Sequence, residues 1–103
     1  MIATVYVPQQ SPMEVSTDGL RMPDASTGFA LVPDEVSRLL DCTPGLVDVL
    51  ASGPDYVAYS IFDYEGDVNP AAMAALAEVS GMKFDSDDED AALQGPVLLV
   101  RRN

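Results

Sequence analysis

Prolines divide this chain into short segments, and that division limits the length of every helix and strand that it can form. Eight prolines are spread along the sequence, and two of them directly follow glycine, at Gly53-Pro54 and Gly95-Pro96. Proline lacks the backbone N–H that helices and sheets use, so regular elements usually end beside one. With 103 residues to divide, the chain has room for one domain, covering residues 1–103, with a single core.

Several of these segments are rich in β-branched, aromatic or alternating apolar residues, which is typical of strands. The segment 56–62, with the sequence YVAYSIF, is expected to be a central strand of the sheet. Asp18-Gly19 lies between two alternating runs and predicts a hairpin over 13–22. The full set of expected strand segments is 2–7, 13–17, 20–22, 29–32, 56–62, 82–84 and 97–100.

Other segments carry helix start and stop signals. Proline near a helix start and glycine after its end predict short helices over residues 33–40, 43–52, 69–80 and 86–94. Together with the strands, this order indicates the α+β class. We expect a mixed, mostly antiparallel sheet of about four or five strands, with three or four short helices packed mainly on one face.

The charge of the chain is far from balanced. Seventeen Asp and Glu residues face five Lys and Arg residues, which gives a net charge of −12 and a pI near 4.1. Such a surface repels DNA, RNA and anionic lipid headgroups, so we expect no direct nucleic-acid or membrane partner. No apolar run is long enough to cross a bilayer, and no signal-peptide pattern is present. The single cysteine, Cys42, cannot form an internal disulfide, which favours a cytoplasmic location.

The residue types that carry most enzyme chemistry are missing. There is no His, one Cys and one Lys, so histidine-based catalysis and thiolate zinc sites are excluded. The glycines form no phosphate-binding loop. A pair of catalytic carboxylates would need a sugar cleft lined with aromatics, and the chain has no Trp. We therefore predict no enzyme activity, no catalytic residue, no cofactor and no dedicated metal site.

Two acidic runs stand out, at residues 63–67 and 85–90. The second has the Ser86–Glu89 spacing of a helix capping box, and the first is typical of a polar turn. Neither run has the glycine and glutamate positions of a calcium-binding loop. An irregular, weak Ca²⁺ site remains an alternative, since clustered carboxylates suit hard cations.

The acidity points to a basic partner surface. A domain of this length is about 33 Å across, and duplex DNA of that length carries about 20 phosphate charges. In size and charge the chain resembles phage-encoded inhibitors of host nucleases and CRISPR complexes, although no motif carries that resemblance. The charge and the size together predict a DNA-mimic inhibitor that blocks a nucleic-acid-binding protein. The partner-binding residues predicted on this basis are Asp63, Glu65, Asp67, Asp85, Asp87, Asp88, Glu89 and Asp90.

Two other functions fit the same composition. An accessory or assembly module would bind protein through an apolar patch, and the candidate residues are Tyr56, Tyr59, Phe62 and Tyr64. Alternatively, the acidity is an adaptation to a high-salt cytoplasm and carries no information about partners. A DNA mimic should stay folded at low salt, whereas a domain adapted to high salt should lose cooperative unfolding there. Binding through an apolar interface would depend little on salt.

Overall fold

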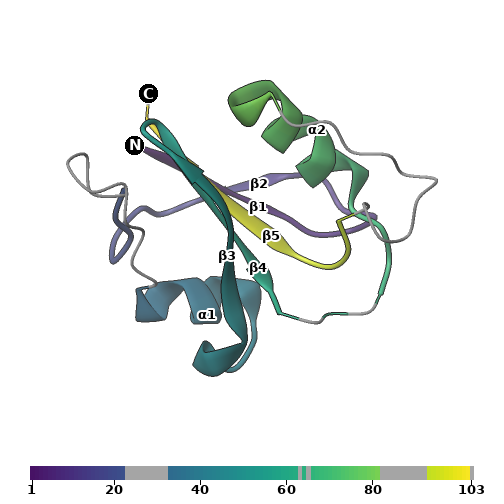
Figure 1. Cartoon of the computed structure of the whole chain (residues 1–103). Helices are drawn as coiled ribbons and strands as arrows, with labels where there is room; N and C mark the ends of the chain where they lie inside the picture. The colour runs from purple at the N-terminus through teal and green to yellow at the C-terminus, as the bar shows by residue number, and fades with distance from the viewer. Residues whose placement is uncertain (23–32, 63, 65, 82–92, 103) are drawn as a thin grey trace.

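The computed structural model describes residues 1–22, 33–62, 64, 66–81 and 93–102, and these form a five-stranded sheet with helices on both faces (Figure 1). All strand pairs are antiparallel, and the order across the sheet is β2-β1-β5-β4-β3. The elements in chain order are β1 (Ile2–Tyr6), β2 (Met13–Val15), α1 (Asp34–Leu40), a 3₁₀ turn (Pro44–Leu46), β3 (Val47–Gly53), β4 (Tyr56–Ile61), α2 (Pro70–Ser80) and β5 (Val97–Arg101).

The C-terminal strand β5 is the centre of the sheet. It pairs with β1 on one side and with β4 on the other, through registers that include Val5↔Leu98 and Tyr59↔Leu98. The four residues from Val97 to Val100 are all buried, as expected for a strand covered on both faces. The last apolar segment of the chain therefore joins the two halves of the fold.

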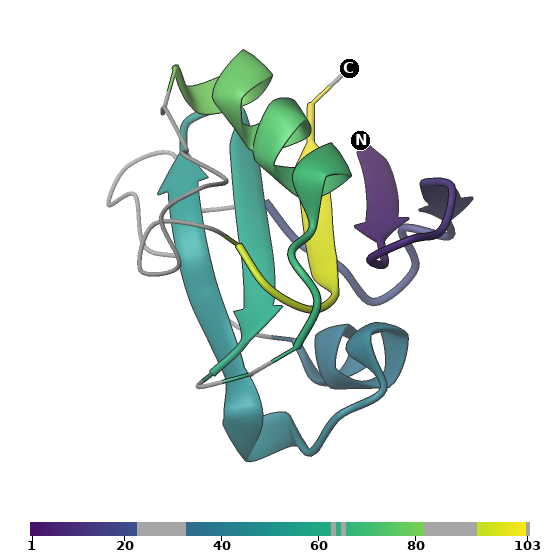
Figure 2. The same ribbon diagram turned by 90° about the vertical axis from the view of Figure 1, so that its right-hand side faces the viewer.

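The two helices cover opposite faces of the sheet (Figure 2). Val36 and Leu40 of α1 belong to a core cluster with Leu98, whereas Leu76 of α2 packs in a separate cluster with Leu99. Successive side chains of a strand point to opposite faces, so Leu98 and Leu99 serve different cores. The expectation that the helices share one face is therefore wrong.

Residues 47–53 form a strand, although a helix was predicted over 43–52. The spacing of Leu46, Val49 and Leu50 suits one helix face, but Val47 and Val49 also alternate as in a strand. Pairing with β4 across the two-residue Pro54-Asp55 loop decides between them, with Val47 opposite Ile61. Leu50 is the extra residue of a bulge in β3, and this irregularity hides the period of the strand.

The predicted hairpin over 13–22 is also wrong in its pairing. β2 pairs with β1, with Ala3 opposite Val15, and not with the segment after the turn. Asp18-Gly19 does form a turn, in which Gly19 has φ +81°, but the turn delivers Leu20 into the core. The Asp-Gly dipeptide thus predicted the turn correctly but not the pairing of the strand before it.

The other predicted elements fall into two groups. Strands at 2–7, 56–62 and 97–100 and helices at 33–40 and 69–80 are confirmed to within two residues. The strands predicted at 29–32 and 82–84 lie outside the described residues, as does most of the helix predicted at 86–94. The described residues contain two α-helices, not three or four, and neither is long and apolar enough to cross a membrane.

One buried amide, Asn69, joins three parts of the fold. Its side chain is 1% exposed, and its Nδ2 donates to the backbone oxygens of Tyr6 and Gly95 at 2.9 and 2.8 Å. Its Oδ1 accepts from the backbone N–H of Ala72 at 3.3 Å and so caps α2. The end of β1, the turn before β5 and the start of α2 are therefore held by one side chain.

Replacing Asn69 with Ala should lower the free energy of unfolding by about 2–4 kcal/mol, because two buried carbonyls and the helix cap lose their partner. Urea denaturation measures the change. Gln10→Ala removes an exposed amide of similar chemistry and should cost less than about 0.5 kcal/mol. Equal losses in both variants would show that the buried amide has no special role.

Candidate functional site

Of the eight predicted partner-binding acids, the structure describes only Asp67. Its carboxylate is exposed and accepts a hydrogen bond from Gln9 Nε2 at 3.1 Å, while its backbone oxygen accepts from Gly95 N at 3.0 Å. These contacts place Asp67 where β1 ends and β5 is about to begin. The other seven, which lie outside the described residues, are Asp63, Glu65, Asp85, Asp87, Asp88, Glu89 and Asp90.

The described part of the chain contains nine acids, and none of their side chains is buried. Two of them form ion pairs with described cations: Glu35 with Arg38 at 3.4 Å, and Asp55 with Arg102 at 3.7 Å. No three of the described His, Cys, Asp and Glu side chains are grouped so as to hold a metal ion. The nine are Glu14, Asp18, Asp34, Glu35, Asp41, Asp48, Asp55, Asp67 and Glu78.

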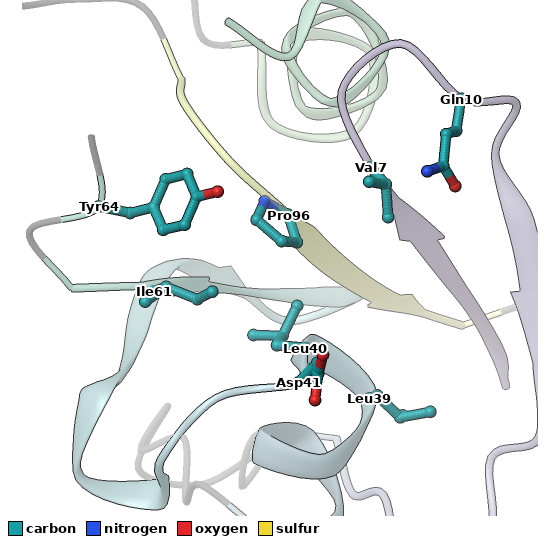
Figure 3. A pocket seen from close by; sticks show the side chains of 8 residues that line it. All are labelled: Val7, Gln10, Leu39, Leu40, Asp41, Ile61, Tyr64 and Pro96. Carbon is teal, nitrogen blue, oxygen red and sulfur yellow. The ribbon is translucent and has the colours of Figure 1, made fainter. Parts of the chain in front are cut away.

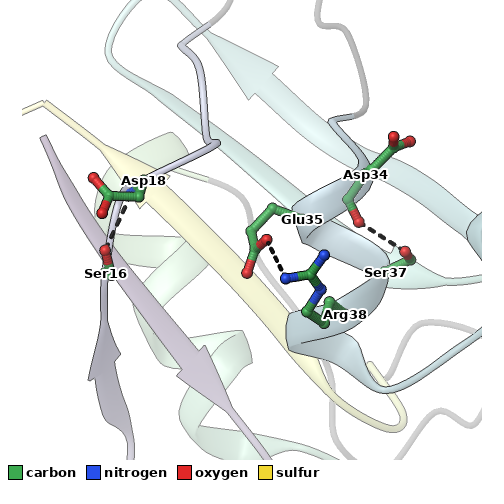
Figure 4. A network of polar contacts seen from close by, with 6 residues as sticks. All are labelled: Ser16, Asp18, Asp34, Glu35, Ser37 and Arg38. Atoms are coloured by element: carbon green, nitrogen blue, oxygen red, sulfur yellow. Dashed lines mark hydrogen bonds and ion pairs between the residues drawn. The ribbon is translucent and has the colours of Figure 1, made fainter.

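Some of these acids gather around the first turn of α1 (Figure 4). The loop that carries Asp18 packs there, since a Cβ placed on Gly19 would lie 3.2 Å from Glu35 Cβ. Asp34 and Glu35 occupy the first turn, where the helix dipole favours negative charge. Stabilisation of α1 is therefore enough to explain why Asp34 and Glu35 lie here, and a binding role is not needed.

An open groove of about 320 Å³ lies at the end of the sheet that Asp67 marks (Figure 3). The ends of β1 and β4, the start of β5 and the C-terminal turn of α1 meet there. Its lining is mainly apolar. The lining residues are Val7, Gln10, Leu39, Leu40, Asp41, Ile61, Tyr64 and Pro96.

The ring of Tyr64 packs against glycine backbones at one wall of this groove. A Cβ placed on Gly66 would come within 2.6 Å of the ring, and a Cβ on Gly95 would also overlap it. Gly95 has φ +76°, a conformation that glycine adopts without strain. Gly66 N also donates to Gln94 Oε1 at 3.2 Å, which ties the Tyr64 turn to the turn before β5.

Among the described residues, Asp41 is the only charged one in the lining, and it occupies an unusual position. It ends α1 in the left-handed region, at φ 56° and ψ 51°, where glycine or asparagine is more common. Its carboxylate lies at the helix C-terminus, where the dipole disfavours negative charge. Burial, and secondarily the charge of Asp41, raise the pKa of the neighbouring Cys42 thiol, which keeps this thiol protonated at neutral pH.

Exposed apolar side chains continue beyond the groove. Phe62 is 63% exposed and Leu46 is 43% exposed, and their backbones are joined by a hydrogen bond from Phe62 N to Leu46 O at 2.7 Å. Of the other aromatics expected to bind protein, Tyr64 is 43% exposed, but Tyr59 is buried in the core, where desolvation raises the pKa of its hydroxyl. Tyr56 is half-buried.

Sequence reasoning missed the groove, because it is assembled from four segments that the sheet brings together. One signal was present in the sequence: an aspartate directly after the apolar face of a helix that ends there. Comparisons of the chain with protein-family models, with curated proteins and with solved structures give no match.

The contact between Gly95 and Tyr64 can be isolated with a matched pair of variants. Gly95 and Gly81 have nearly the same φ, +76° and +74°, but a Cβ on Gly81 meets nothing within 4 Å. We expect Gly81→Ala to cost about 1 kcal/mol for the backbone alone. Gly95→Ala should cost about 1–3 kcal/mol more, because the Tyr64 ring must move. Equal costs in urea denaturation would contradict the described contact.

Replacing Asp41 with Asn should raise the free energy of unfolding by about 0.3–1 kcal/mol, since the charge at the helix C-terminus is removed and asparagine tolerates the left-handed conformation. Thermal and urea unfolding at low ionic strength measure this gain. Asp48→Asn, an exposed change of the same charge on β3, is the control and should show no comparable gain.

Proposed function

We propose that this protein is a non-enzymatic, cytoplasmic binding protein that mimics DNA and blocks a basic, nucleic-acid-binding surface on a partner protein. The observation that carries the proposal is the state of the carboxylates. None of the described ones is buried, and only Glu35 and Asp55 lie within ion-pair distance of a described cation. Side chains in this state are free to form charge-assisted hydrogen bonds with Arg and Lys of a partner.

The length and the net charge of the molecule can be compared with those of duplex DNA, and the comparison supports mimicry. Its longest axis is 36 Å, and duplex DNA of that length carries about 21 phosphate charges. The net charge of −12 is more than half of that value.

Spread evenly over the 6256 Å² surface, the 17 acids would lie about 19 Å apart, which is too sparse to imitate a phosphate backbone. Mimicry therefore requires carboxylates that are clustered on the surface. The runs at 63–67 and 85–90 contain eight acidic residues that are close together in the sequence.

The interior of the fold is also consistent with this role. Among the described residues, Asn69, a neutral amide, is the polar side chain that is fully buried, and the two described core clusters contain no charged residue. Carboxylates that take no part in the core can be replaced without unfolding the domain. This makes the proposal testable by charge substitution.

A second function is favoured by one specific observation. Phe62, Leu46 and Tyr64 expose apolar surface beside the groove, and exposed aromatics often anchor protein interfaces. An accessory or assembly module would use that surface as its main contact. Its binding would depend little on salt, whereas a DNA mimic loses affinity as salt rises.

The direct test of the proposal is affinity capture with tagged protein from lysate of its native host, eluted by a salt gradient and identified by mass spectrometry. We expect a nucleic-acid-binding protein that elutes with rising salt and that duplex DNA of about 30 base pairs displaces in a purified assay. A partner that resists salt and is unaffected by DNA would favour the assembly module. Capture of no partner would count against both.

Substitution of the five acids in the 85–90 run by Asn and Gln should weaken binding to the captured partner by about tenfold or more and flatten its salt dependence. The far-UV circular dichroism should not change. A control with the same composition and charge change replaces five exposed acids elsewhere, namely Asp18, Asp34, Asp48, Asp55 and Glu78. Equal weakening in both variants would show that net charge, and not this run, carries the binding.

A further inference from the structure

We infer that the groove at the end of the sheet receives an arginine side chain from the basic partner. This inference rests on the proposed function, because it specifies how a basic protein is held. Among the described residues, the groove is lined by Leu39, Ile61, Pro96 and other apolar side chains, and the carboxylate of Asp41 is the only charge. That combination suits a ligand with an aliphatic stem and a cationic tip.

The size of the groove fits a single side chain. Its volume of about 320 Å³ is at the lower limit of pockets that bind small molecules, which start near ~300 Å³. It is also open to solvent. A side chain projecting from a partner can enter such a site without any movement of the fold.

The position of Asp41 is costly for the fold alone. A negative charge at a helix C-terminus is unfavourable, and a left-handed residue there is usually glycine or asparagine. Local features that conflict with stability concentrate at functional sites. An incoming cation would remove this conflict, because it would neutralise the carboxylate beside the helix end.

Tyr64 favours arginine over lysine as the occupant. Its ring packs against Gly66 and Gly95, and Figure 3 shows its hydroxyl directed toward Pro96 on the groove wall. A planar guanidinium can stack on an aromatic ring and bind a carboxylate through two parallel hydrogen bonds. The ammonium of lysine lacks the planar fork that this pairing requires.

The described arginines of the chain itself do not fill the groove. Arg38 pairs with Glu35, and Arg102 contacts Pro54 and Asp55 at the opposite end of β5. No described arginine lines the groove. The cation that complements the charge of Asp41 is therefore expected to come from a partner protein.

The test is an NMR titration with Nα-acetylarginine amide, followed in ¹H–¹⁵N correlation spectra of the whole chain. We expect saturable shifts concentrated at the backbone amides of residues 39–41, 61, 62, 64, 94, 95 and 97. Nα-acetylcitrulline amide has nearly the same shape but no charge, and it should bind about three- to tenfold more weakly. Equal binding of both compounds, or shifts spread over all exposed acids, would overturn the inference.

Variants of the groove make the test specific. Asp41→Asn should weaken the arginine probe by about three- to tenfold, while the control Asp48→Asn leaves it unchanged. Gln10 is exposed and lines the groove, so its replacement should not disturb folding. Gln10→Glu should tighten binding of the probe, and Gln10→Lys should weaken it, because the added charge lies at the groove. No response to either change would contradict the inference.

The outcomes also separate this inference from the proposed function. If the captured partner is displaced by DNA but binds Asp41→Asn and Gln10→Lys as tightly as the native chain, the groove inference fails and mimicry stands. If the groove binds the probe but no DNA-competed partner exists, the proposed function fails. Shifts at the same amides that depend on protein concentration, without probe, would assign the groove to a second copy and overturn the partner arginine.

Discussion

The arrangement of this fold depends on the hydrogen bonds of one buried amide. Asn69 binds the carbonyls of Tyr6 and Gly95 and the N–H of Ala72, and its own backbone N–H donates to Leu93 O at 2.8 Å. These contacts join chain segments that are far apart in sequence, and they fix where β1 ends and where β5 begins. The groove lies at that same end of the sheet, so its walls are positioned by an interaction that involves no charge.

The described charges of the molecule lie apart from its core. The two clusters packed on either side of β5 are apolar, and the described carboxylates remain at the surface. Interactions between exposed charges add little to stability, so these acids contribute little to holding the fold together. Asp41 is the exception in position, since it borders an apolar groove and opposes the dipole of its own helix. A cationic side chain from a partner would fill the groove with its apolar stem and neutralise the carboxylate at the helix end.

The sequence predicted the class of the fold and the positions of the strands at 2–7, 56–62 and 97–100, because strong apolar segments bounded by proline or glycine are local signals. The prediction from sequence was wrong where the pairing of strands determines the structure. Residues 47–53 suit a helix face or a strand, and only the partner strand β4 selects the strand. The Asp18-Gly19 turn was recognised, but β2 pairs backwards with β1. The groove was not predictable, because its lining combines four segments whose proximity follows from the strand order.

We expect the fold to be held by uncharged interactions, with its carboxylates left at the surface. Equilibrium unfolding by urea, measured from about 10 mM to about 1 M salt, tests this most directly. We predict one cooperative transition at every salt concentration, with unfolding free energies that differ by less than about 2 kcal/mol across the range. Loss of cooperative unfolding in dilute buffer, restored by salt, would contradict it and identify the acidity as an adaptation to a salt-rich solvent.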